Sequence, residues 1–444
     1  MEISRAAQQA EDACSDVEGL RLSAGPTPTP TAISLFAGIG GFDLALERAG
    51  ARVLMHCERD AFCQSVLRKH WPSVELASDI RTLQASEVPD ADIWTAGFPC
   101  QDVSLARGNH GRTGLRGEHT SLFFDLIRLA SQKRPKVILL ENVVGLLNSH
   151  RGADFAIVVS ELAKIGYAVS WRVLNARYFG APQSRSRVFI SAWRNDYKKS
   201  LGSLFEDVIG HVPEPPRRGF LRHSVHGATG AIVPEVAYCV AATSGRHTGN
   251  DWSRSYVSYE SRVRRPTPTE SERLQGFPAD WTLPPAVSTN EAKAYDSERY
   301  KAAGNAVAVP VVSWIVERII DQLTMQHSAS RSFVSSVHTI APDLKSSSQA
   351  LLDITDIALV AEGLAPHRWL TGGCLWRGKL IEASVSPAPS EAIDSLFVTA
   401  LDSEKPDERF FITPNAAKGI LRRADSVGRS LFTPLRSALE KMTQ

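Results

Sequence analysis

Cys100 is the first candidate for chemistry, because its thiol follows an apolar run at the start of a polar loop. The stretch is DIWTAGFPCQDVS, in which Pro99 directly precedes the cysteine. A thiolate held at such a place could act as a nucleophile. A cysteine at the end of a strand can also be a small core residue. Taken alone, Cys100 leaves both interpretations open.

A carboxyl and a basic strand could assist such a nucleophile. Glu141 ends the apolar run VILLE, which predicts partial burial and a raised pKa for its carboxyl. Gln183, Arg185 and Arg187 alternate along PQSRSRVFI, so we expect all three on one face of a strand. The alternatives are an acid that simply ends a strand and a solvated basic edge.

A glycine-rich turn is the candidate ligand site. In SLFAGIGGFDLAL, three glycines lie between an expected strand and an expected helix, and such a turn lets a ligand approach the backbone. Glu58 ends the next strand, where nucleotide sites place a ribose-binding carboxylate, and Asp79 could contact an adenine edge. Because the spacing is not GxGxxG, we favour an adenosyl ligand without a pyrophosphate. The alternative is a tight turn with exposed acids nearby.

The elements that must position these residues follow an alternating pattern. Apolar runs such as AISLF, RVLMHCE, KVILLENV, AVSWRVLNA and RVFISAW alternate with amphipathic stretches such as FDLALERAG and ADFAIVVSELAKIG. Strands that alternate with helices of this length predict a doubly wound α/β fold with a mostly parallel sheet.

Composition sets broad limits. With 444 residues and 43% hydrophobic content, the chain can form two or three domains. The net charge of +2 neither demands nor excludes nucleic acid. Six cysteines without a CxxC pair predict reduced thiols rather than a zinc site or a disulfide framework. No apolar signal core or membrane-length run occurs, so we expect a cytoplasmic protein.

Six motifs resemble those of the C5-cytosine-specific DNA methyltransferases of bacteria and phages. FAGIGG, GFPCQDVS, ENVVGL, QSRSRVF, RPTPTESERLQGFP and GNAVAVPV occur in the order and spacing of that family, over roughly 280 residues. The resemblance implies an S-adenosylmethionine-dependent methyltransferase fold with a small inserted target-recognition domain. It also implies S-adenosyl-L-methionine as cofactor, no metal, and double-stranded DNA as substrate.

The resemblance assigns catalytic roles to four matching positions. Cys100 matches the cysteine that attacks C6 of cytosine, which makes C5 able to accept a methyl group. Glu141 matches the glutamate that contacts N3 and the 4-amino group. Arg187 matches the contact to O2, and Arg185 orders the active site.

The same resemblance assigns cofactor contacts and candidate DNA contacts. The cofactor residues are Phe36, Gly38, Gly40, Gly41, Glu58, Asp79, Ile80, Pro99, Asn305 and Val307. The DNA candidates are Gln101, Ser104, Arg246, Asn250 and Arg254. The last three are chosen because their side-chain types suit guanine or adenine edges, and they could equally be phosphate contacts or parts of a solvated loop. The sequence departs from the family at Asp43, where arginine is commoner, and at Arg59, where an apolar residue is frequent. Because a stacked base cannot be attacked, the target cytosine must be flipped out of the duplex.

The chain is expected to divide into five segments. They are a flexible tail (1–30), a catalytic and cofactor-binding domain (31–199, completed by 300–325), a target-recognition domain (200–299), a linker (326–348) and a C-terminal extension of unknown role (349–444). Lys418, Arg422, Arg423 and Arg429 in the extension could favour DNA or form a solvated helix face.

Two other functions were weighed against DNA methylation. An RNA cytosine-5 methyltransferase would share the fold, but the longer second module and the complete RLQGFP and GNAVAVPV motifs favour DNA. A non-catalytic DNA-binding protein would not need the intact set of Cys100, Glu141, Arg185 and Arg187. We expect a monomer from a restriction–modification, orphan or phage system, with any cognate restriction endonuclease acting separately.

Overall fold

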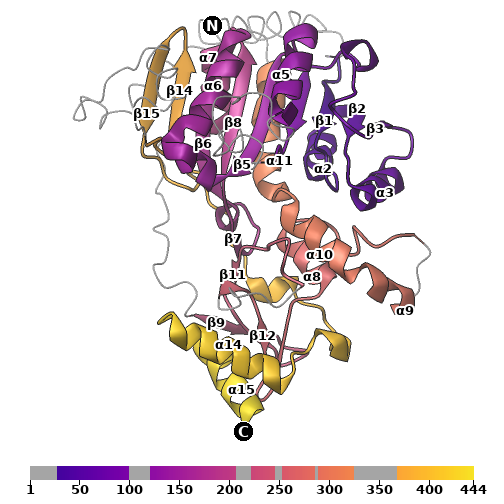
Figure 1. Cartoon of the computed structure of the whole chain (residues 1–444), viewed down its shortest axis with the longest axis vertical. Helices are drawn as coiled ribbons and strands as arrows, with labels where there is room; N and C mark the ends of the chain where they lie inside the picture. Colours follow the sequence, from indigo (N-terminus) through magenta and orange to yellow (C-terminus); the bar gives the residue numbers. More distant parts are fainter. Residues whose placement is uncertain (1–27, 100–120, 207–221, 246–252, 286–288, 325–367) are drawn as a thin grey trace, which may run out of the picture.

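A nine-stranded sheet forms the larger part of the molecule (Figure 1). The computed structural model describes residues 28–99, 121–206, 222–245, 253–285, 289–324 and 368–444. The strand order is β15-β14-β6-β8-β5-β4-β1-β2-β3. The α/β fold predicted from the alternating pattern is confirmed.

The two halves of the large sheet differ in strand direction. Strands β1 to β5 pair in parallel, whereas β8, β6, β14 and β15 pair in antiparallel fashion. The bounds are β1 (Thr31–Leu35), β2 (Arg52–Cys57), β3 (Glu75–Ala77), β4 (Ile93–Ala96), β5 (Val137–Val143), β6 (Tyr167–Asn175), β8 (Ser186–Arg194), β14 (Gly372–Trp376) and β15 (Lys379–Ala383). Because helices cover both faces, the central strands are almost continuously apolar.

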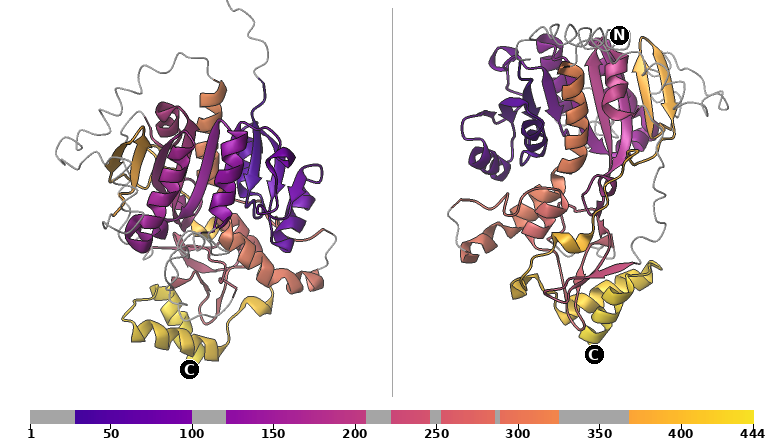
Figure 2. Two further views of the ribbon diagram at one scale, coloured as in Figure 1. Left: turned by 45° about the horizontal axis from the view of Figure 1, so that its top comes forward. Right: turned by 180° about the vertical axis from the view of Figure 1, so that it is seen from behind.

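Helices form one layer on each face of this sheet. On one face, α5 (Ser121–Lys133) and α6 (Ala153–Lys164) bury Phe123 and Phe155. On the other face, α11 (Val309–Thr324) contacts both α2 (Gly41–Arg48) and α7 (Tyr197–Leu204), and α3 (Ala61–His70) joins the same core. The view from behind in Figure 2 shows α11 crossing this second face.

A second, smaller sheet lies beyond the end of the large sheet (Figure 1). We call it the small sheet. Its order is β13-β12-β10-β9, with bounds β9 (His223–Val225), β10 (Ile232–Pro234), β12 (Val257–Ser258) and β13 (Val263–Arg264). Between the two sheets, β7 (Gln183–Ser184) pairs in parallel with β11 (Ala237–Tyr238). Helices α8 (Pro268–Leu274), α9 (Thr289–Ala292) and α10 (Asp296–Asn305) then lead back to α11.

The last part of the chain contacts both sheets. Strand β14 pairs with β6, about 200 residues earlier in the chain. The 3-10 helix η9 (Phe397–Ala400) then contacts β10 and α8. Helices α14 (Pro414–Ser426) and α15 (Thr433–Thr443), called here the C-terminal helix pair, cover the small sheet. The C-terminal residues therefore link the two sheets.

The expected domain boundaries remain predictions. Residues 1–27 of the expected tail and the whole expected linker at 326–348 lie outside the described residues. Within the described ranges, no single helix is long and apolar enough to cross a membrane. One pair bent by 42°, Lys293–Asn305 with Val309–Thr324, passes that test when taken together.

Candidate active site

The glycine turn after β1 contains one glycine that faces open space and two that pack against the protein. Gly38 has a φ of +57°, and a Cβ atom there would meet nothing within 4 Å. A Cβ atom on Gly40 would approach the Trp71 ring to 2.3 Å. A Cβ atom on Gly41 would approach Val307 to 2.7 Å. Gly38 therefore leaves room for a ligand, whereas the other two glycines allow the turn to pack.

Glu58 holds this turn in place from the end of β2. Its Oε2 accepts a hydrogen bond from the Gly38 N–H at 2.8 Å, and its Oε1 accepts one from the Asp60 N–H at 2.7 Å. Asp60 caps α3 through its side chain and pairs with Lys301 Nζ at 2.7 Å. Because a carboxylate oxygen can accept more than one hydrogen bond, Glu58 can still receive ribose hydroxyls.

Asp79 lies beside the turn and is already engaged. Its two oxygens accept hydrogen bonds from Arg81, with 3.0 Å between Arg81 Nε and Asp79 Oδ1. These hydrogen bonds lower the pKa of Asp79, although its partial burial opposes this. Arg128 on α5 fixes the same segment by donating to the Ile80 carbonyl at 3.2 Å. An adenine amino group would therefore share the Asp79 carboxylate with Arg81.

Glu141 and Arg187 form an ion pair at the carboxyl end of β5. Arg187 Nε lies 3.0 Å from Glu141 Oε1. Glu141 is only 8% exposed, and burial raises its pKa, while the charges of Arg187 and Arg185 oppose the rise. The predicted burial and raised pKa of this carboxyl are thus confirmed. Next to it, Asn142 Nδ2 donates to the Phe98 carbonyl at 2.9 Å and fixes the chain just before Pro99.

Arg185 is buried and binds backbone carbonyls. Its guanidinium donates to the carbonyls of Val240 at 2.9 Å, Ala306 at 2.6 Å and Gly304 at 3.2 Å. Burial lowers the pKa of Arg185, and the neighbouring charge of Arg187 lowers it further. The side chain therefore ties the end of α10 to the strand that carries Arg187.

The expectation that Gln183, Arg185 and Arg187 share one strand face is wrong. Gln183 lies in β7, which pairs with β11, whereas Arg187 lies in β8 of the large sheet, and Arg185 lies between the two strands. The Gln183 side chain instead donates to the Leu274 carbonyl at 2.7 Å and accepts from the Val240 N–H at 3.0 Å. A break in strand direction, which local alternation does not reveal, turns Gln183 away from the two arginines.

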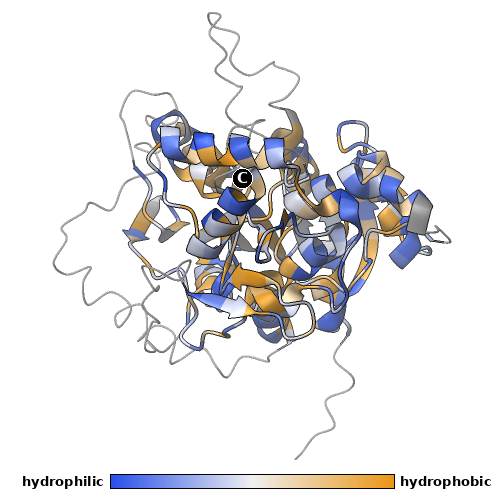
Figure 3. Ribbon diagram, turned by 90° about the horizontal axis from the view of Figure 1, so that it is seen from below, coloured by the Kyte–Doolittle hydropathy of each residue, from blue (hydrophilic) through white to orange (hydrophobic). Residues whose placement is uncertain are grey.

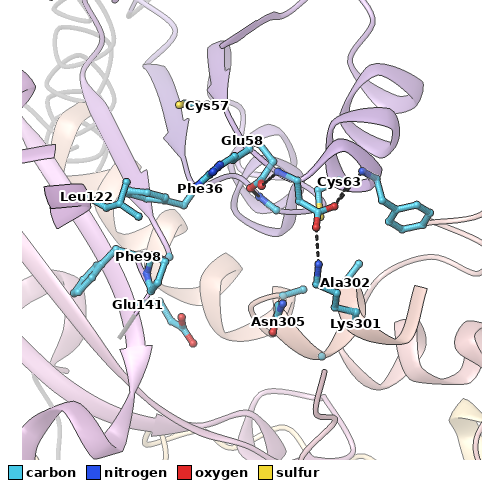
Figure 4. Close-up of a pocket in the computed structure, with 18 of the residues that line it drawn as sticks. Phe36, Cys57, Glu58, Cys63, Phe98, Leu122, Glu141, Lys301, Ala302 and Asn305 are labelled. Carbon is cyan, nitrogen blue, oxygen red and sulfur yellow. Dashed lines mark hydrogen bonds and ion pairs between the residues drawn. The ribbon is translucent and has the colours of Figure 1, made fainter. Parts of the chain in front are cut away.

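One cavity of about 610 Å³ brings most of the predicted site residues together (Figure 4). The turn and acid residues lie on one side, and Glu141 with its arginines lies on the other. The predicted residues in its lining are Phe36, Gly38, Glu58, Asp79, Ile80, Pro99, Glu141, Arg185, Arg187 and Asn305. Gly40, Gly41 and Val307 do not line it.

The cavity is also lined by residues that were not among the predicted site residues, although several of them belong to the motifs. They are Cys57, Arg59, Asp60, Phe62, Cys63, Ser78, Gly97, Phe98, Leu122, Asn142, Val143, Glu298, Lys301, Ala302, Gly304 and Ala306. The spacing of residues along α10 could have indicated two of these lining residues from the sequence. Lys301 and Glu298 precede Asn305 by four and seven residues on α10, and this spacing places all three on one helix face.

Several predicted residues lie outside the described part of the chain. They are Cys100, Gln101, Ser104, Arg246 and Asn250. Arg254 is described, and its guanidinium binds the Thr243 hydroxyl at 2.7 Å and the Thr243 carbonyl. Among the described residues, no group of three or more His, Cys, Asp or Glu side chains could hold a metal ion.

Known proteins are similar to this chain over the residues that form β1 to β13. The profile of the C-5 cytosine-specific DNA methylase family matches residues 31–218 and 218–321. The type II methyltransferase M2.BsuMI of Bacillus subtilis (strain 168) is 34% identical over 311 residues, which cover 65% of this chain and 74% of that protein. The type II methyltransferase M.HaeII of Haemophilus aegyptius is 33% identical over 311 residues, covering 66% and 93%.

A solved structure agrees in fold. The crystal structure of S. pombe Dnmt2 methyltransferase superposes with a TM-score of 0.50 at 20% identity, covering 67% of this chain and 100% of that chain. The family match ends at residue 321, so β14, β15 and the C-terminal helix pair lie beyond it.

Proposed function

The chain belongs to the C-5 cytosine-specific DNA methylase family, and we propose that it methylates C5 of a cytosine flipped out of a specific short duplex DNA sequence. The methyl donor is S-adenosyl-L-methionine. The reaction passes through a covalent bond between Cys100 Sγ and C6 of the base. As a DNA (cytosine-5-)-methyltransferase, the chain needs one site for the donor beside one site for the base.

The observation that carries this proposal is the shared cavity. The Gly38–Glu58 turn and the Glu141–Arg187 ion pair line the same 610 Å³ space. Pro99, the residue before Cys100, also lines it. Two reactants held in one cavity react as if in a single molecule, which lowers the entropic part of the barrier.

The donor half of the cavity fits an adenosyl group. Gly38 leaves open space at the turn, and Glu58 offers carboxylate oxygens suited to ribose hydroxyls. Phe36 and Ile80 supply apolar lining, and Asp79 an acceptor for an amino group. When bound, S-adenosylmethionine supplies an electrophilic methyl group on sulfur. The other residues that would hold it are Pro99 and Asn305 in the lining, with Gly40, Gly41 and Val307 supporting the turn.

The base half of the cavity would stabilise charge on the cytosine ring. The Cys100 thiolate would add to C6, and the electron pair of the C5–C6 bond would become available at C5 for bonding to the methyl carbon, whose bond to the donor sulfur would break with its electron pair left on sulfur. Burial raises the pKa of Glu141, which makes protonation of its carboxyl easier; the protonated carboxyl would donate a hydrogen bond to N3, and Arg187 would interact with O2. Loss of the C5 proton then lets the C6–S bond break, which restores the ring and the thiolate.

Arg185 acts as a positioning residue in this scheme. Its hydrogen bonds to Gly304 and Ala306 hold the end of α10, which carries Asn305 into the donor half. We assign target recognition to residues 200–299, with Gln101, Ser104, Arg246, Asn250 and Arg254 as candidate DNA contacts. The setting is the bacterial cytoplasm, where a monomer would act in a restriction–modification, orphan or phage system, separately from any cognate endonuclease.

The test is to offer the full-length protein duplex DNA and tRNA together with labelled S-adenosylmethionine. We expect label in the DNA, and sequencing of the methylated positions should find 5-methylcytosine in one short motif. Label that enters only RNA would overturn the DNA assignment, and label at another base or atom would overturn the chemistry.

A further inference from the structure

The C-terminal helix pair concentrates positive charge. Residues 414–444 contain six basic and two acidic side chains, a net charge of +4, whereas the whole chain carries only +2. The other residues together are therefore slightly acidic. A local excess of this size attracts a polyanion even when the whole protein is nearly neutral.

The two acidic side chains of the helix pair do not neutralise the positive charges on its solvent-facing side. Asp425 and Glu440 each lie 2.9 Å from the same side chain, Arg436. Lys418 and Arg422 on α14 are exposed, and neither has an acid partner within the described residues. These two cations therefore remain available to an external anion.

The geometry of α14 places these cations on its solvent side. Ala417, Ile420 and Ala424 are fully buried against the small sheet and α15. Lys418 and Arg422 are one helical turn apart and project about 6 Å from each other along the axis. Figure 3 views the molecule from the end that α14 and α15 form, where hydrophilic and hydrophobic segments alternate along the helices.

The turn between α14 and α15 lies near the junction of the two sheets. Burial raises the pKa of Tyr238 in β11, and the positive charge of Arg429 in this turn opposes the rise. Phe432 at the start of α15 lies 6.3 Å from His223 in β9, measured between ring centroids. The next residue after Tyr238 is Cys239, whose Sγ accepts a hydrogen bond from Arg185 Nη1 at 3.4 Å. The exposed Arg429 therefore lies near Tyr238 of β11, between the two sheets.

Buried contacts hold the helix pair on the small sheet. Ile420, Leu435 and Leu439 share one core with Tyr256 and Val263 of the small-sheet region. The pair cannot swing freely while this core is intact. Its charges therefore keep a fixed position relative to the junction.

We propose that the C-terminal helix pair is a second DNA-binding surface of this enzyme, which contacts phosphates of the duplex flanking the methylated site through Lys418 and Arg422, with Arg429 nearest the junction. This inference rests on the proposed action on duplex DNA and extends it beyond residues 200–299. Exposed lysine and arginine that contact phosphates add affinity and fix position, but they carry no base specificity. The surface should therefore strengthen binding to every sequence equally.

The experiment compares the salt dependence of DNA binding for three full-length proteins. They are the wild type, the double variant Lys418→Ala/Arg422→Ala, and the control Arg134→Ala/Arg194→Ala, which removes two exposed cations just before β5 and at the end of β8, at the end of the large sheet away from the small sheet. The probe is a mixed-sequence duplex, with a tRNA as the competing polyanion. Each lost phosphate contact should make the slope of log K against log[salt] less steep by about 0.9 and weaken binding roughly eightfold at 0.1 M salt.

We expect the flatter slope only in the Lys418→Ala/Arg422→Ala protein on duplex DNA, with kcat at saturating plasmid DNA unchanged. An unchanged slope, an equal change in the control, or a change seen only with tRNA would overturn the inference. The charge-reversed variant Lys418→Glu/Arg422→Glu should enlarge the effect, and an effect no larger than that of alanine would count against direct phosphate contact. Failure of the proposed function is distinguishable, because it would abolish methyl transfer in all proteins without equalising their slopes.

Discussion

The active-site cavity and the C-terminal helix pair both carry charged groups, but they hold them in opposite ways. In the cavity, Glu141 and Arg185 are 8% and 3% exposed and are fixed by an ion pair or by backbone carbonyls. On α14, Lys418 and Arg422 stand in solvent above an apolar core. Burial shifts the pKa of a charged group, which can suit it to proton transfer. An exposed charge keeps its ordinary properties and contributes mainly by attracting ions of opposite charge.

The largest expected effect comes from removing the buried acid. Glu141→Gln keeps the shape of the side chain but cannot give up a proton. We expect kcat for methyl transfer to fall by about 10²–10⁴, the usual contribution of a general acid. The matched control is Glu161→Gln on α6, which removes a partly exposed carboxylate that pairs, among the residues that the structure describes, with Lys164. If both variants retained more than half of the wild-type kcat, Glu141 would not act as a general acid.

On the C-terminal side, stability should depend on the apolar face rather than on the charges. Ile420→Ala removes a fully buried side chain and should lower the free energy of unfolding by about 2–5 kcal/mol. Lys418→Ala on the opposite face should change it by less than about 0.5 kcal/mol. Denaturant unfolding curves measure both values. A similar loss in the two variants would mean that α14 is not anchored by its apolar face.

The glycine turn allows a finer comparison between Gly38, which lines the cavity, and Gly40, which packs behind it. Gly40→Ala would push a Cβ atom into Trp71 and should cost about 3 kcal/mol of stability, whereas Gly38→Ala should cost about 1 kcal/mol for its left-handed backbone. Affinity for S-adenosylmethionine, measured calorimetrically on the folded proteins, should fall more in Gly38→Ala than in Gly40→Ala. Stronger cofactor loss in Gly40→Ala than in Gly38→Ala would place the ligand elsewhere.

The smallest expected effect is a pH dependence set by Glu141. Burial raises its pKa above the ordinary 4.5, so the native state binds this proton more tightly than the unfolded state. Its contribution to stability is present below pH 4.5 and is lost as the pH rises through the native pKa. Above that pKa, kcat should fall at most tenfold per pH unit. In Glu141→Gln this decline should disappear, and its persistence would assign it to another group.

Local sequence patterns predicted the strands and the turn because both depend on neighbouring residues. The apolar run VILLE was enough to predict that Glu141 would be buried with a raised pKa. The pairing of β14 with β6 was not predictable, since it joins segments about 200 residues apart. The separation of Gln183 from Arg187 depends likewise on β11, which arrives from more than fifty residues later. The ion pair between Lys301 and Asp60 was not predictable either, because the two residues are 241 positions apart in the sequence.

In the proposed mechanism this cavity presents a flipped cytosine to the Cys100 thiolate, and covalent trapping on DNA can detect the bond that forms. Duplex DNA that contains 5-fluorocytosine at the methylated position cannot lose the group on C5, so the C6–S bond persists after methyl transfer. We predict a denaturation-resistant protein–DNA adduct that requires S-adenosylmethionine and is absent in Cys100→Ser. Undiminished trapping by Cys100→Ser would contradict the account, because another residue would then be the nucleophile.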